Sequence, residues 1–266
     1  MIRIIPFIFT IISLVSVNLH SQPPEVIAAY ELQNAIKNGK LEEIKKYVTD
    51  GKDINIQYNG RNALHVACDI GSLEAVKALL ESGIDIKTGR DDGKGISTLQ
   101  NAIKSFKCPP EIITLLLEKG ADVNTVGPNA IIAVNEAVRK SGDKAVSLNI
   151  LTLLLEKGAN VDPEIDGNSP LINAILHNRP DMAELLIKYN ADVNRPSKKG
   201  MYPIHYAVEN KQIEVLKLLL AQNVKKEVKN PEGQSGLEYA SQKVNTKYLD
   251  PVSKKKYQEI VSILSK

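Results

Sequence analysis

The pentapeptide GADVN at residues 120–124 recurs as GANVD at residues 158–162 and as NADVN at residues 190–194. Two degenerate copies, GKDIN and GIDIK, stand at residues 51–55 and 83–87. Each copy follows a run of apolar residues with the spacing of an amphipathic helix. Similar strings at a regular spacing are typical of a repeat architecture, in which one small structural unit is stacked several times.

A second signature, an apolar residue followed three places later by Ala, occurs seven times. The pairs are Leu32 with Ala35, Leu64 with Ala67, Leu99 with Ala102, Val134 with Ala137, Leu171 with Ala174, Ile204 with Ala207, and Leu237 with Ala240. Successive pairs lie 32 to 37 residues apart. A period near 33 residues with two short helices in each unit predicts an all-α solenoid.

The motifs ALHVA at residues 63–67, SPLINA at 169–174 and YPIHYA at 202–207 stand where the ankyrin-repeat family has its TPLHxA motif. The chain therefore resembles the ankyrin repeat over about residues 25 to 266. The resemblance implies seven helix-turn-helix repeats joined by β-hairpin turns, with repeats starting near residues 29, 61, 96, 131, 168, 201 and 234. It also implies that residues 22–266 form a single ankyrin-repeat domain.

Residues at the predicted helix ends have the required chemistry. We expect the first helices to be capped by Asn62, Ser97, Ser169 and Ser235, whose side chains can accept the unpaired N–H groups. Pro170 and Pro203 suit the first helical position. We expect left-handed residues after the second helices at Gly51, Gly83, Gly120, Gly158, Asn190 and Asn223. The fourth repeat is the poorest match, because Ile132 stands at its cap position.

Three insertions account for the longer spacings, and all are expected in turns. Residues 107–110 lengthen the turn between the two helices of the third repeat, and residues 142–148 do the same in the fourth. Residues 87–95, KTGRDDGKG, enlarge a hairpin tip. They lack the spacing of a phosphate-binding loop and the alternating oxygen ligands of a calcium loop.

Residues 1–21 have the pattern of a secretory signal. Arg3 supplies the positive charge, and residues 4–17 form an apolar run of 14 residues. A bilayer span takes about 20 residues, so an uncleaved membrane anchor is the less favoured alternative. We expect cleavage before Gln22 and export of the mature bacterial protein to the periplasm or beyond the cell, without stable membrane insertion.

Composition excludes several classes of protein. The chain has 43% hydrophobic and 5% aromatic residues and no Trp, so aliphatic side chains must fill its core. A formal net charge of +3 is too small for a dedicated nucleic-acid binder. Positive charge is concentrated in residues 198–266, which carry 13 Lys and seven acidic residues. A solvated surface is the favoured explanation, and attraction to an acidic partner or an anionic membrane is the alternative.

The histidines and cysteines give little sign of chemistry. His65 and His205 occupy the histidine of the repeat motif, and the resemblance implies that each bonds backbone in the neighbouring turn. His177 is either a solvated side chain or a partner contact. Cys68 and Cys108 could form a disulfide in an exported protein. The favoured alternative is one buried thiol and one thiol in a surface turn.

No acid, base and nucleophile occur in a catalytic pattern, so we expect no enzyme activity, no cofactor and no metal site. The resemblance implies a protein-binding module that uses a concave surface of hairpin tips and first helices. A dedicated accessory or inhibitor that docks on one enzyme or toxin is the alternative. The candidate partner-binding residues, where the motif leaves the side chain free, are Tyr58, Asn59, Arg61, Asp69, Lys94, Lys104, Arg139, Lys140, Ile165, Asn168, His177, Lys198, Lys199, Met201 and Glu209.

Overall fold

The computed structural model describes residues 23–58, 60–87, 95–127, 131–140, 142–163 and 167–266. The predicted signal at residues 1–21 lies outside the described residues, as do most of the hairpin tip at 87–95 and the candidate residues Asn59, Lys94 and Ile165. By its internal contacts the chain divides into two compact units, Met1–Ala121 and Asp122–Lys266.

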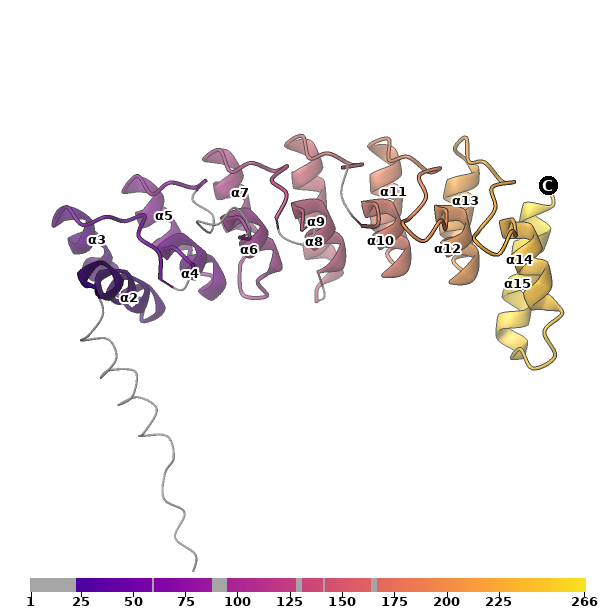
Figure 1. The fold of residues 1–266 in the computed structure, drawn as a ribbon, viewed down its shortest axis with the longest axis horizontal. Coiled ribbons are helices and arrows are strands. Elements are labelled where there is room, and N and C mark those ends of the chain that lie inside the picture. Colours follow the sequence, from indigo (N-terminus) through magenta and orange to yellow (C-terminus); the bar gives the residue numbers. More distant parts are fainter. Residues whose placement is uncertain (1–22, 59, 88–94, 128–130, 141, 164–166) are drawn as a thin grey trace, which may run out of the picture. The chain divides into compact units, whose positions relative to one another are not determined.

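The first unit contains three described helix pairs (Figure 1). They are α2 (Pro24–Lys37) with α3 (Leu41–Thr49), α4 (Ala63–Ile70) with α5 (Leu73–Glu81), and α6 (Thr98–Lys104) with α7 (Pro110–Glu118). The first helices pack in the order α2, α4, α6, and the second helices pack in the order α3, α5, α7. Each repeat therefore contacts its sequence neighbour, as a stacked repeat must.

The second unit contains four described helix pairs stacked in the same way. They are α8 (Ala133–Arg139) with α9 (Lys144–Glu156), α10 (Pro170–Leu176) with α11 (Pro180–Lys188), α12 (Pro203–Glu209) with α13 (Ile213–Leu220), and α14 (Gly236–Val244) with α15 (Pro251–Leu264). The helix pairs of the two units confirm the seven predicted repeats. Aliphatic residues fill the interior as expected, and both Leu116 and Leu154 are 0% exposed.

The predicted caps are confirmed at the starts of the first helices. The side chains of Asn62, Ser97, Ser169 and Ser235 each accept the backbone N–H three residues later. Ile132 offers no side-chain cap to α8, as expected. A local side-chain cap thus marks the start of four of the seven described first helices.

The left-handed residues after the second helices are confirmed with one exception. The four glycines have φ between 71° and 90°, and Asn190 has φ 66°. Asn223 does not have a positive φ, so its prediction was wrong. The chain leaves α13 through bonds from Gln222 N–H to the Leu219 carbonyl and from Val224 N–H to the Gln222 carbonyl. These bonds turn the chain without a left-handed residue at position 223.

The fourth-repeat insertion lies mostly in a helix, which corrects its predicted place in a turn. Helix α9 has 13 residues, whereas α3, α5, α7 and α11 have nine each. The Asp143 carboxylate accepts the N–H groups of Ala145 at 2.7 Å and Val146 at 3.3 Å, so the helix begins at Lys144. A good capping residue at this position extends the helix through residues that were expected to be irregular.

Side chains of the recurring pentapeptide join neighbouring repeats. The side-chain oxygen of its last residue accepts a backbone N–H of the next repeat. The pairs are Asn55 with Asp85 at 2.8 Å, Asn124 with Asn160 at 2.7 Å, Asp162 with Asp192 at 2.5 Å and Asn194 with Lys225 at 2.8 Å. The recurrence of Asn or Asp therefore has a physical cause, because in these four copies this position links the turn to the following one.

The motif histidines also join repeats, which confirms their structural interpretation. His65 Nε2 lies 3.1 Å from the Ile96 carbonyl, and His205 Nε2 lies 3.1 Å from the Gln234 carbonyl. The backbone N–H of Tyr202 donates to His205 Nδ1 at 3.2 Å, which leaves Nε2 as the donor to Gln234. Burial is the main cause of the lowered pKa of His205.

The turns between repeats lack the paired strands of the predicted hairpins within the described residues. Within the described residues there is no regular strand, and the one isolated bridge pairs Tyr58 with Arg61. Two backbone hydrogen bonds close each of two tips. Ser197 N–H donates to the Met201 carbonyl at 2.8 Å and Gly200 N–H to the Ser197 carbonyl at 2.9 Å, and Asn230 N–H donates to the Gln234 carbonyl at 2.8 Å and Gly233 N–H to the Asn230 carbonyl at 2.9 Å. These two tips position side chains that line the larger cavity of the second unit.

Candidate functional site

The predicted binding residues fall into separate places. In the first unit, Lys104 is exposed at the end of α6, and the Tyr58 ring stands edge-on to that of Tyr30 with ring centres 5.5 Å apart. In the second unit, six of the predicted residues line two different cavities. Asn168 and Lys198 line neither of these cavities. The predicted residues that line cavities in the second unit therefore form two groups of three.

Arg61 and Asp69 do not have free side chains, which corrects an expectation. Arg61 Nη2 donates to the Asp69 carboxylate and to the His65 carbonyl. Asn101 in the next repeat donates through Nδ2 to Asp69 Oδ1 at 2.8 Å and to the His65 carbonyl at 3.1 Å. This network joins the second and third repeats. Arg61 and Asp69 therefore have a structural role, and a partner would have to compete with these bonds for their side chains.

The larger of the two cavities, here called the sixth–seventh groove, has a volume of about 670 Å³. It brings together three predicted residues: Lys199, Met201 and Glu209. Sequence reasoning missed its other lining residues, which are Tyr206, Asn230, Pro231, Glu232, Gln234, Tyr239 and Gln242. Two hairpin tips and the first helices α12 and α14 supply all of them.

Hydrogen bonds fix the walls of the sixth–seventh groove. The Tyr206 hydroxyl donates to Ser197 Oγ at 3.1 Å, and Gln234 Nε2 donates to Gln242 Oε1 at 3.0 Å. Burial, followed by the charges of Glu209 and Glu232, raises the pKa of Tyr239, so its hydroxyl stays protonated at neutral pH. The groove therefore combines aromatic rings, a fixed amide pair and charges of both signs.

The smaller cavity, here called the basic pocket, has a volume of about 230 Å³. It brings together the predicted residues Arg139, Lys140 and His177. Sequence reasoning missed its other lining residues, which are Val138, Gly142, Lys144 and Arg179. The fourth-repeat insertion that lengthens α9 could have directed attention to Lys144, but nothing in the repeat pattern marks Arg179.

A further cavity of about 330 Å³ lies on the first repeat. Two of its three lining lysines are paired with lining carboxylates, since Lys40 contacts Glu43 at 2.7 Å and Lys46 contacts Asp50 at 2.8 Å. The third, Lys52, lies over the Tyr47 ring at 5.0 Å from its centre. These pairs lie on the surface and neutralise one another. The charged groups that line this cavity are therefore balanced, so the cavity does not favour a ligand of either charge.

Cys108 is buried, which corrects its predicted place in a surface turn. It is 5% exposed because residues 105–109 fold onto the end of α4, where Ser105 Oγ donates to the Asp69 carbonyl at 3.2 Å. Cys68 and Cys108 are free thiols in contact with each other. Their hydrogen bond, followed by burial, raises the pKa of Cys68 well above its ordinary value. Cys68 therefore packs as a protonated thiol.

No group of three or more metal-ligating side chains is placed to hold an ion among the residues that the structure describes. None of the described helices combines the length and apolar character needed to cross a membrane.

Comparison with known proteins identifies relatives of this repeat architecture. The family description "Ankyrin repeats (3 copies)" matches residues 32–126 and 137–197, and "Ankyrin repeats (many copies)" matches residues 178–220. Palmitoyltransferase AKR1 of Lachancea kluyveri is 26% identical over 247 residues, which cover 77% of this chain and 33% of that protein. Phosphocholine transferase AnkX of Legionella pneumophila is 25% identical over 156 residues, which cover 59% of this chain and 16% of that protein.

This chain thus spans a third or less of the length of these two relatives. Among solved structures, the ankyrin repeat domain of human ASB11 has a TM-score of 0.65 at 24% identity. The match covers 90% of this chain and 97% of that domain. At this identity the likeness shows a shared fold.

Proposed function

Because this chain belongs to the ankyrin-repeat family, we propose that it is a non-catalytic module that binds another protein in the sixth–seventh groove. Ankyrin repeats are protein-interaction modules. The observation that carries the proposal is the groove itself, where two hairpin tips and two first helices enclose about 670 Å³. Concave sites of this size are typical binding sites in folded proteins.

The lining chemistry of the groove suits an extended segment of a partner protein. Tyr206 and Tyr239 offer aromatic rings, and tyrosine is a frequent anchor residue in protein interfaces. Lys199, Glu209 and Glu232 lie around them, so charged side chains of either sign can be paired. The protonated Tyr239 hydroxyl can donate to a backbone carbonyl of the partner.

The relatives with named transferase activities do not carry those activities over to this chain. The matched region covers 33% of the palmitoyltransferase and 16% of the phosphocholine transferase, and the match runs through repeats. We therefore propose binding without turnover. A screen of the purified protein against hydrolase and acyl-transfer substrates should give no turnover, and sustained turnover would contradict this part of the proposal.

We further propose that the protein acts outside the cytoplasm, in the bacterial envelope or beyond it. The support is the sequence pattern of residues 1–21, with Arg3 ahead of an apolar run at 4–17. N-terminal sequencing of the mature protein should begin within a few residues of Gln22. Recovery of the intact N-terminus from the soluble cytoplasm would overturn this proposal.

The binding site is tested with a partner captured from the envelope fraction and then purified. A groove variant with Lys199, Met201 and Tyr239 replaced by Ala should weaken binding at least about tenfold in calorimetry, since anchor residues carry most of the affinity. The control replaces second-helix residues Lys45, Lys77, Glu156 and Lys217 by Ala and should leave affinity within about twofold. The opposite result would place the partner on the second helices.

Stoichiometry distinguishes two forms of the proposed function. A tight one-to-one complex with a single enzyme or toxin would favour a dedicated accessory or inhibitor. Several partners of weak affinity would favour a general scaffold. Calorimetry at two salt concentrations also measures how far the excess of lysine in residues 198–266 strengthens association with an acidic partner.

A further inference from the structure

We propose that the basic pocket binds a small oxyanion of the phosphate or carboxylate class. Five of its seven lining residues carry side chains that are or can become cationic: Arg139, Lys140, Lys144, His177 and Arg179. Among the residues that the structure describes, no acidic residue lines it. This site lies entirely in the second unit and does not depend on the binding role proposed for the sixth–seventh groove.

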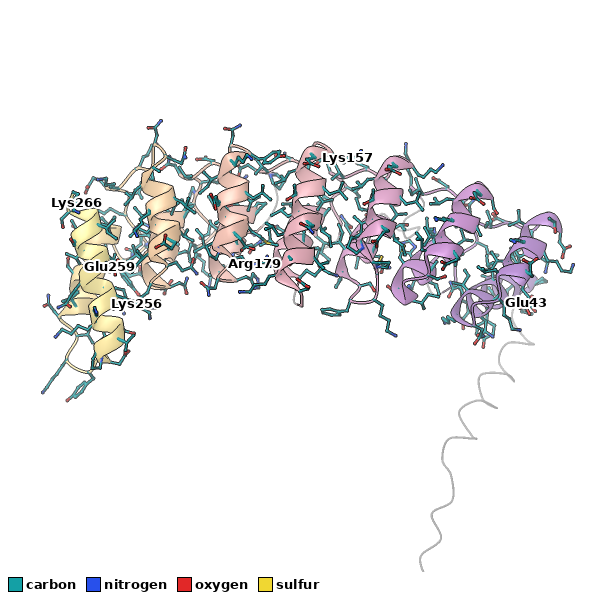
Figure 2. The ribbon with its side chains drawn as sticks, turned by 180° about the vertical axis from the view of Figure 1, so that it is seen from behind. Glu43, Lys157, Arg179, Lys256, Glu259 and Lys266 are labelled. Carbon is teal, nitrogen blue, oxygen red and sulfur yellow. The ribbon has the colours of Figure 1, made fainter. Side chains whose placement is uncertain are left out.

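Two neighbouring repeats form the basic pocket. Arg139 ends α8, and Lys144 begins α9 across a short turn. His177 follows the end of α10. Arg179, which is labelled in Figure 2, precedes α11. The turns between the paired helices of the fourth and fifth repeats therefore face the same cavity.

Arg179 forms a rigid, buried wall of the pocket. It is 5% exposed, and its guanidinium bridges to the lengthened part of α9. Nη1 donates to Ser147 Oγ and Nη2 donates to the Lys144 carbonyl, both at 3.0 Å. Nε and Nη2 donate to the two carboxylate oxygens of Asp181 at 3.0 and 2.7 Å. One of the five guanidinium N–H groups, on Nη1, has no partner among the described residues.

The described carboxylates near the pocket have partners of their own. Asp181 is held by Arg179, and Asp143 caps α9 through its backbone N–H groups. Glu136 is mostly buried and lies 4.0 Å from Arg139. Lys144 forms no ion pair with any described residue. The two arginines and two lysines of the pocket outnumber these three carboxylates by one.

The size and donor chemistry of the pocket define the ligand. Ammonium and guanidinium groups only donate, so the ligand must present several acceptor oxygens. A volume of about 230 Å³ lies below the range of pockets for drug-sized ligands, so it suits one oxyanion group. Arginine and lysine together are common partners of phosphate and carboxylate oxygens. Free phosphate and an acidic side chain of a bound protein would both present this chemistry.

The test follows the backbone amide resonances of residues 138–144 and 177–179 by NMR in the full mature chain. Sodium phosphate, sodium acetate and sodium chloride are titrated at constant ionic strength. We expect saturable shifts with phosphate or acetate and none with chloride. Saturation by phosphate alone assigns a phosphoryl ligand, and saturation by acetate assigns a carboxylate.

The matched variants replace Lys140 and Lys144 by Ala in the pocket, or Lys198 and Lys199 by Ala at a hairpin tip. The first pair should weaken the oxyanion affinity at least tenfold, and the second pair should leave it within twofold. Arg179 is kept, because its bonds support the fold. No saturable shift with either oxyanion, equal shifts with chloride, or equal affinities in the two double variants would overturn the proposal.

Discussion

Two insertions between paired helices, one in the third repeat and one in the fourth, adopt different structures in this protein. In the third repeat, residues 105–109 form an irregular turn that folds back onto the second repeat and buries Cys108. In the fourth repeat, the inserted residues extend α9, and the short turn before it borders the open basic pocket. The same kind of departure from the repeat period thus gives a closed structural turn in one place and a cavity in the other.

The difference comes from the residues that meet each insertion. Gly71 lets the Lys107 carbonyl approach closely, so the third-repeat turn can seat against α4. In the fourth repeat, Arg179 donates hydrogen bonds to Lys144 and Ser147 on α9. Its positive charge lies in a cavity that other cationic side chains also line. An insertion therefore indicates a functional site only when the groups that line it have a chemistry in common.

The largest effect is expected where the closed turn meets α4. Gly71 has φ 75°, and a Cβ there would overlap the Lys107 carbonyl oxygen. Gly71→Ala should lower the free energy of unfolding by about 3 kcal/mol, from backbone strain and from displacement of the packed turn. Urea unfolding followed by circular dichroism measures this loss.

Gly39→Ala is the matched control, because Gly39 has φ 67° and no heavy atom within 4 Å of an added Cβ. It should cost only about 1 kcal/mol, the strain of a left-handed alanine. If the two variants lost the same unfolding free energy, the close approach of the Lys107 carbonyl to Gly71 would not contribute to the effect of Gly71→Ala.

The thiols of the closed turn should be protected in the native protein. Cys68 and Cys108 are both buried, and the pKa of Cys68 is raised well above its ordinary value, which disfavours the reactive thiolate of Cys68. Modification by a disulfide reagent at pH 8 should be at least about 100-fold slower than in denaturant, because it requires local opening. Gly71→Ala should accelerate it, and reaction at the rate of free thiols would show that the turn is open.

The wall of the basic pocket should contribute to stability although the pocket is open. Arg179→Met removes four hydrogen bonds of a buried guanidinium and should lower the free energy of unfolding by about 2 kcal/mol at pH 7. Urea unfolding of the variant beside the parent protein measures the difference. A loss under about 0.5 kcal/mol would mean that these bonds only exchange for bonds to water.

The same variant has a defined pH dependence. Burial acts to raise the pKa of Asp181, but the Arg179 hydrogen bond, the Met182 N–H and the Arg179 charge together lower it. A lowered folded-state pKa contributes stability above the ordinary pKa of about 3.9, and this contribution is lost as pH falls through the folded-state pKa. The difference in unfolding free energy between the parent protein and Arg179→Met should therefore narrow below about pH 4, while the part due to the Ser147 and Lys144 bonds remains. A difference that does not change with pH would contradict the ion pair with Asp181.

The smallest effects are expected at the exposed rim of the basic pocket. The side chains of Arg139 and Lys144 are exposed, so replacing each by Ala should change the free energy of unfolding by less than about 0.5 kcal/mol. Thermal unfolding of the two single variants measures these changes. If either variant lost more than about 1 kcal/mol of unfolding free energy, the side chain would contribute to the fold, as the third-repeat turn does.

The amino-acid sequence by itself determined the repeat number, the helix caps and the aliphatic core. These features depend on local chemistry, because a capping side chain such as Ser97 and its N–H partner lie three residues apart. It also predicted the bonds of His65 and His205 to neighbouring turns, through the family resemblance. Asn223 was missed because two consecutive backbone bonds made a left-handed residue unnecessary there.

Only the tertiary structure decided which side chains share a site. Arg179 bonds Ser147 from 32 residues away, and Asn101 bonds Asp69 from 32 residues away, so both contacts depend on how neighbouring repeats stack. For the same reason the sequence indicated Arg139 and His177 as single exposed residues without showing that one cavity holds both. Periodicity fixes which residues belong to each helix, but the register between stacked repeats fixes which of them meet.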